Sequence, residues 1–152
     1  TAKYCMSATA NRNGITLIAV IMGAETKDIR NKEVCKLFDY GYANCNLYKD
    51  ENVLDTCSVS IENGISDELA IESASDFSSV LLRGEKADDV KKTPVQEETL
   101  TAPINKGDVI GKMEYSINGR VLGSVEIVAA ENIKKMTFGY SFKKVLYLAF
   151  RS

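Results

Sequence analysis

The chain contains no histidine among its 152 residues. This absence excludes catalytic triads with a histidine base, zinc sites with imidazole ligands and imidazole-based pH switches. The four cysteines include no Cys-x-x-Cys pair, and this spacing argues against a zinc knuckle or a thioredoxin motif. We therefore expect no metal and no cofactor, and we expect the cysteines to be buried thiols with packing roles.

Long apolar runs are also lacking, since none approaches the roughly 20 residues that a membrane-spanning helix needs. Charge is present but unevenly distributed. The formal net charge is −2, yet the residues from Ile133 onward carry cations and no acid, which leaves about −7 on the rest. Because phosphate binding needs a cationic face on the folded body, this acidic body argues against nucleic acid as a partner.

The first 46 residues predict a hairpin followed by a helix. An alternating strand, Lys3–Ala10, leads to the turn-forming Asn13-Gly14 and then to an apolar run, Ile15–Met22, that we expect to be buried on both faces. Thr26 or Asp28 can cap the helix that follows. A buried strand beside such a helix is typical of a sheet covered by helices, so we expect this segment to be the end of a larger catalytic domain.

After a polar stretch, Tyr48–Asn52, that we interpret as a linker, short strands follow one another at the spacing of a small β-sandwich. The predicted fold class is α+β: a partial sheet-and-helix segment, an all-β sandwich-like domain and a C-terminal amphipathic helix. The predicted boundaries are residues 1–48, 49–54 (linker), 55–132 and 133–152. The expected strands are Asp55–Ile61, Glu68–Ser73, Phe77–Leu82, Val95–Leu100, Val109–Ile117 and Val121–Ala130.

The last segment, Lys134–Ser152, predicts a cationic amphipathic helix. Such a helix lies in a bilayer interface, held by apolar side chains and by attraction to anionic lipid at about 1 kcal/mol per cation. A terminal helix docked on its own domain is the alternative. The residues expected at the membrane interface are Phe138, Phe142, Lys143, Lys144, Leu146 and Phe150.

Two stretches of the sequence resemble one family, the low-molecular-weight penicillin-binding proteins, which are serine-type D-Ala-D-Ala carboxypeptidases of bacterial peptidoglycan. Tyr4-Cys5-Met6 through Leu17–Ala24 to Tyr40-Gly41-Tyr42 looks like the last hairpin and helix of their β-lactamase-like transpeptidase domain. The stretch from Leu100 through Lys106-Gly107-Asp108 to Ile127–Glu131 looks like their β-rich C-terminal domain. Essentially the whole chain is covered by the resemblance.

The resemblance implies that the family's catalytic motifs precede this chain. These motifs are Ser-x-x-Lys, Ser-x-Asn and Lys-Thr-Gly. Ser141-Phe142-Lys143-Lys144 and Ser116-Ile117-Asn118 fit the first two patterns by chance, in reversed order, and Lys92-Thr93 is followed by Pro94. We therefore expect no catalytic residue in this chain and no activity of the chain alone.

Arg30 is the one substrate-binding residue that the resemblance implies. It matches the family arginine placed to bind the free carboxylate of the terminal D-alanine, a task that suits the two-pronged guanidinium. The alternative is a surface arginine that pairs with Glu33 one helical turn later.

The sequence therefore supports two hypotheses of different classes. In the first, the chain is the C-terminal portion of a D-Ala-D-Ala carboxypeptidase, outside the cytoplasm at the outer face of the membrane, whose partners are peptidoglycan stem peptides, β-lactams and the anionic membrane surface. In the second, it is a non-catalytic wall- or membrane-binding β module. A β-lactamase-fold protein with another substrate range is a third possibility.

Overall fold

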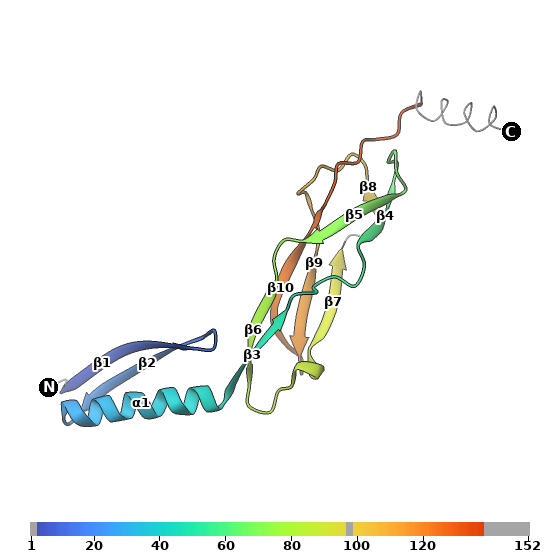
Figure 1. Cartoon of the computed structure of the whole chain (residues 1–152). Helices are drawn as coiled ribbons and strands as arrows, with labels where there is room; N and C mark the ends of the chain where they lie inside the picture. Colours follow the sequence, from blue (N-terminus) through green and yellow to red (C-terminus); the bar gives the residue numbers. More distant parts are fainter. Residues whose placement is uncertain (1–2, 97–98, 139–152) are drawn as a thin grey trace. The chain divides into compact units, whose positions relative to one another are not determined.

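The computed structural model describes residues 3–96 and 99–138 (Figure 1). The chain divides into two compact units. The hairpin–helix unit comprises the residues up to Lys49 together with Ser78–Val90, and the β unit comprises Asp50–Phe77 and the residues from Lys91 onward. The domain boundaries drawn from the sequence remain predictions.

The hairpin–helix unit begins with two antiparallel strands, β1 (Tyr4–Arg12) and β2 (Ile15–Ala24). Asn13 and Gly14 join them with φ angles of 52° and 81°. Asparagine and glycine tolerate this left-handed conformation, which matches the twist of a tight hairpin. The predicted hairpin is confirmed.

Helix α1 (Lys27–Ala43) follows and packs on one face of this hairpin. The Thr26 side chain caps it by accepting a hydrogen bond from the Ile29 amide at 3.2 Å. The helix approaches β2 so closely that a Cβ atom on Gly41 would lie 2.6 Å from Cδ1 of Leu17. The predicted helix and its cap are therefore confirmed.

The opposite face of β2 is open, and the expectation that this strand is buried on both faces is wrong for this chain. Ile15 and Ala19 point toward the helix and are buried. Ile18, Val20 and Met22 alternate with them and are 72%, 59% and 80% exposed. Because side chains alternate across a strand, one helix can cover only one of its faces.

Two further strands, β3 (Cys45–Asp50) and β6 (Phe77–Leu82), form a two-stranded sheet. The stretch Tyr48–Asp50, interpreted from its polarity as part of a linker, thus belongs to a strand.

The exposure of the four cysteine thiols also differs from expectation. Cys5, Cys35 and Cys57 are exposed and Cys45 is half-buried, so the prediction of buried packing thiols is wrong for the described chain.

The β unit contains one six-stranded sheet with the order β7-β9-β10-β5-β4-β8 (Figure 1). Neighbouring strands are antiparallel except for the parallel pair β4–β8. A short 3-10 helix, η1 (Ala87–Asp89), precedes β7 in the sequence. The strands are β4 (Ser58–Glu62), β5 (Glu68–Ser73), β7 (Lys91–Gln96), β8 (Leu100–Thr101), β9 (Val109–Ile117) and β10 (Arg120–Ala129).

The β-rich domain is confirmed, but its strands form one curled sheet instead of two packed sheets. A strongly twisted sheet can curl around its own core, so a second sheet is not needed. Alternate residues of β9 and β10 supply this core, and the ring of Phe77 stacks on Tyr115 with 3.7 Å between centroids. The buried residues of these two strands are Ile110, Met113, Tyr115, Ile117, Val125, Ile127 and Ala129.

The segment after β10 departs from the predicted terminal helix. Residues 134–137 are not helical, and Lys135 forms an isolated bridge with Gly64. Residues 139–152, which hold most of the predicted helix, lie outside the described residues. Within the described part of the chain, no helix combines the length and the apolar character needed to cross a membrane.

Candidate functional site

Arg30 lies in the first turn of α1, and its backbone amide donates to the Thr26 carbonyl at 3.1 Å. The side chain is half-buried. Nε and Nη2 of the guanidinium both donate to Oδ1 of Asn31, at 3.2 and 3.0 Å. A guanidinium has five N–H donors, so further donors remain for a bound carboxylate.

The alternative role for Arg30 requires an ion pair with Glu33, and this ion pair is not formed. Glu33 pairs instead with Lys36, with 2.8 Å between the charged atoms. The start of a helix also carries partial positive charge, which favours an anion near Arg30. The local geometry is therefore compatible with carboxylate binding, and the substrate-binding role of Arg30 stays a prediction.

A cluster of polar side chains that the sequence did not single out surrounds Asp50. Oδ2 of Asp50 accepts from the Tyr115 hydroxyl at 2.9 Å and lies 2.5 Å from Nζ of Lys92, which also donates to the Asn52 carbonyl at 2.8 Å. Oδ1 accepts from the Asn52 amide at 3.0 Å. The Asp50 side chain is 10% exposed.

This environment fixes the charge of Asp50. Burial by itself raises the pKa of the carboxyl, but the hydrogen bonds from Lys92, Tyr115 and Asn52 outweigh it, and the pKa lies below its ordinary value. Asp50 is therefore a carboxylate whose acceptors are used within the protein. Such a satisfied network stabilises the fold and offers no free acid or base for catalysis.

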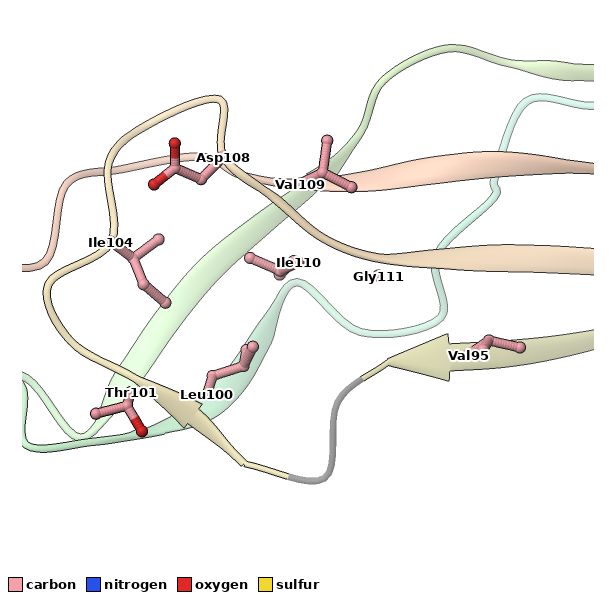
Figure 2. A pocket seen from close by; sticks show the side chains of 8 residues that line it. All are labelled: Val95, Leu100, Thr101, Ile104, Asp108, Val109, Ile110 and Gly111. Atoms are coloured by element: carbon pink, nitrogen blue, oxygen red, sulfur yellow. The ribbon is translucent and has the colours of Figure 1, made fainter.

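The β unit contains an open pocket of about 760 Å³ (Figure 2). Leu100, Ile104 and Ile110 form its buried apolar part. Asp108 lines it as well, but its carboxylate accepts from the Asn105 amide at 2.8 Å. Among the described residues that line this pocket, there is neither a nucleophile with a neighbouring base nor a second carboxylate.

The other residues considered as site candidates are those predicted at the membrane interface and Ser116. Phe138 is 87% exposed, whereas Phe142, Lys143, Lys144, Leu146 and Phe150 lie outside the described residues. Ser116 is on β9 next to the turn to β10, consistent with an accidental Ser-x-Asn match. No group of three potential metal ligands occurs among residues 3–96 and 99–138.

Comparison with known proteins assigns the chain to a family. Residues 42–135, more than half of the chain, match the family model described as "Penicillin-binding protein 5, C-terminal domain". The chain belongs to this penicillin-binding protein family. The family is that of the low-molecular-weight penicillin-binding proteins, which are serine D-Ala-D-Ala carboxypeptidases, and the chain contains their C-terminal domain.

The similarity to penicillin-binding proteins extends beyond that domain. The chain is 30% identical over 148 residues to the D-alanyl-D-alanine carboxypeptidase DacF of Bacillus subtilis (strain 168), an alignment that covers 95% of this chain and 38% of DacF. It is 27% identical to DacC of Escherichia coli (strain K12), covering 90% of this chain and 34% of DacC. The chain thus spans little more than a third of the curated relatives it matches.

Solved structures agree with this assignment. Penicillin-binding protein 5 from Haemophilus influenzae superposes with a TM-score of 0.70 at 26% identity, over 88% of this chain and 40% of that structure. The carboxypeptidase DacD from Francisella tularensis gives a TM-score of 0.62 at 20% identity, over 89% of this chain and 34% of that structure. The second match shows a shared fold.

Proposed function

We propose that this chain is the C-terminal portion of a serine D-Ala-D-Ala carboxypeptidase that trims peptidoglycan stem peptides through an acyl-enzyme. The observation that carries the proposal is the extent of the similarity to DacF, which covers 95% of the chain and therefore includes the hairpin and α1 as well as the β unit. The family's motifs place the nucleophile and its lysine base in the portion of the enzyme that precedes this chain.

The first contribution of this chain is to complete the catalytic domain. The apolar residues Ile18, Val20 and Met22 are exposed in a row on one face of the hairpin. Among the described residues, β1 is also an edge of its two-stranded sheet. A sheet face with this composition and an open edge strand need covering in a stable protein, and the preceding portion of the enzyme supplies the cover.

The second contribution is recognition of the substrate's terminal carboxylate by Arg30. A carboxypeptidase must distinguish a free chain end from an internal peptide bond, and two charge-assisted hydrogen bonds from a guanidinium provide that distinction. The half-buried position of Arg30 in the first turn of α1 supports this role.

The third contribution is placement of the enzyme at the outer face of the cytoplasmic membrane. The basic segment after Ile133 and the aromatic residues Phe138, Phe142 and Phe150 support contact with an anionic lipid surface. The β unit then acts as the stalk between that surface and the catalytic domain.

The Arg30 role is tested in the full-length enzyme with two substrates, a peptide that ends in free D-alanine and the same peptide with an amidated end. Arg30→Gln should lower kcat/KM for the free acid by roughly 10- to 100-fold, since it removes hydrogen bonds to a charged group worth about 1.5–3 kcal/mol. Activity on the amide should hardly change. Lys32→Gln, on the same helix, is the matched control.

Equal losses on the two substrates would show that Arg30 acts through the structure and not through the carboxylate. The alternative function, a non-catalytic wall- or membrane-binding module, makes a different prediction. In that case the full-length protein would not hydrolyse the terminal peptide bond of either substrate, whichever residue occupies position 30.

A further inference from the structure

The segment that follows β10 is held in place by a series of backbone hydrogen bonds. Ile133 and Ile104 exchange two of them, at 2.8 and 3.0 Å. Lys134 then accepts from the Ile65 amide at 3.0 Å, and the Met136 amide donates to the Asn63 carbonyl at 2.7 Å. Four bonds within four residues tie this segment to two separate parts of the β unit.

Gly64, at the tip of the β4–β5 hairpin, lies at the centre of this arrangement. It is buried and forms the antiparallel bridge with Lys135. A Cβ atom at this position would lie 2.8 Å from Cγ2 of Ile133 and 2.6 Å from the Ser66 carbonyl oxygen. Contacts this short are not tolerated, so the close approach of the two segments requires a glycine here.

We propose that the hairpin tip Asn63–Ile65 and the segment Ile133–Met136 form a clasp. This clasp fixes the point at which the basic tail, the residues that follow Met136, leaves the β unit. The Ile133 side chain is 4% exposed, which anchors one end of the clasp in the core. The clasp gives the tail a stiff base in place of a free hinge. Its use, holding the β unit in one orientation at a lipid surface, rests on the membrane contact of the proposed function.

The clasp predicts that residues 133–136 resist opening although their lysines are exposed. Hydrogen exchange of the Ile65 and Met136 amides, measured by NMR on the 152-residue chain, should be slow, and trypsin should cut slowly after Lys134 and Lys135 because a protease needs an unpaired, extended backbone. Gly64→Ala should accelerate exchange and cleavage by about tenfold or more, since each process follows the local opening equilibrium. Ser60→Ala, in the same hairpin, is the matched control.

Met136→Pro provides a second variant, because it removes the amide that donates to Asn63 without altering the core. We expect faster hydrogen exchange of the Ile65 amide in this variant. Unchanged exchange and cleavage in Gly64→Ala, with a wild-type circular dichroism spectrum, would overturn the clasp. If Gly64→Ala does not fold, unchanged exchange in Met136→Pro overturns it.

The experiments distinguish an error in the clasp proposal from an error in the proposed membrane contact. These measurements need no lipid, so a clasp that holds in solution stands even if the chain does not bind vesicles of anionic phospholipid. Conversely, if vesicles bind the wild-type chain while Gly64→Ala exchanges at the wild-type rate, the membrane contact stands and the clasp is wrong.

Discussion

The hydroxyl of Tyr115 donates a hydrogen bond of 2.9 Å to Asp50, 65 residues earlier in the chain. Tyr115 is fully buried on β9, and Asp50 is the first residue of the β unit. Lys92 on β7 neutralises the carboxylate. The three side chains thus tie the start of the β unit to its sheet through one ion pair and one hydrogen bond to the same carboxylate.

We predict that Asp50→Asn lowers the free energy of unfolding by about 1–3 kcal/mol, because it leaves the Lys92 ammonium without its counterion and weakens two hydrogen bonds to a charged group. Urea denaturation followed by circular dichroism measures the change. The control is Lys112→Met, which breaks an exposed pair with Glu114 and should cost less than about 0.5 kcal/mol. Similar effects of the two substitutions would contradict the special role of the network.

The same network predicts a pH dependence with a defined sign. Because the folded pKa of Asp50 is below its ordinary value of 3.8, the stabilisation is complete above about pH 4–5 and disappears as the pH falls through the folded pKa. The stability difference between wild type and Asp50→Asn should therefore shrink between pH 7 and pH 3. A difference that is constant or grows on acidification would refute this assignment.

The open face of the hairpin predicts self-association of the isolated chain. Val20→Lys places a charge among exposed apolar side chains and should shift the chain toward monomer in sedimentation velocity. Val121→Lys, at a similarly exposed position on β10, should not. In the full-length enzyme Val20→Lys should lower stability by about 2 kcal/mol or more, since the lysine is then buried. If Val20→Lys leaves the stability of the full-length enzyme unchanged, this face of the hairpin is not covered there.

The basic tail predicts binding to vesicles that contain anionic phospholipid. Reversing Lys143 and Lys144 to glutamate should weaken binding by at least about 30-fold, at about 1 kcal/mol for each cation removed. Reversing Lys27 and Lys32 on α1 provides a control with equal change in net charge. Co-sedimentation measures both variants, and equal losses would show that binding follows net charge instead of the tail.

Local signals in the sequence were sufficient for much of the fold. The Asn13-Gly14 turn depends on left-handed backbone conformations that few residues adopt, and the Thr26 cap depends on a side-chain oxygen that accepts from the helix, so the residue types predict both. Strands β5, β6 and β9 have the predicted bounds. In each of these cases the deciding interactions are between near neighbours or follow a regular period.

Long-range pairing decided the features that the sequence did not reveal. Tyr48–Asp50 is polar and becomes a strand because β3 pairs with β6, about 30 residues later. Asp50, Lys92 and Tyr115 are unremarkable in the sequence and meet only in the folded sheet. Arg30 was identified through the resemblance to the family, and no local pattern distinguishes it from other helix-surface arginines.

The central proposal is that this chain is part of a serine carboxypeptidase whose nucleophile lies in the portion that precedes it. Labelling with a fluorescent penicillin, followed by mass spectrometry of the labelled peptide, tests this claim most directly. The account predicts that the full-length protein is labelled at the serine of a Ser-x-x-Lys motif before Thr1, and that the 152-residue chain alone is not labelled. Labelling of the isolated chain at Ser141 or Ser116, or no labelling of the full-length protein, would contradict it.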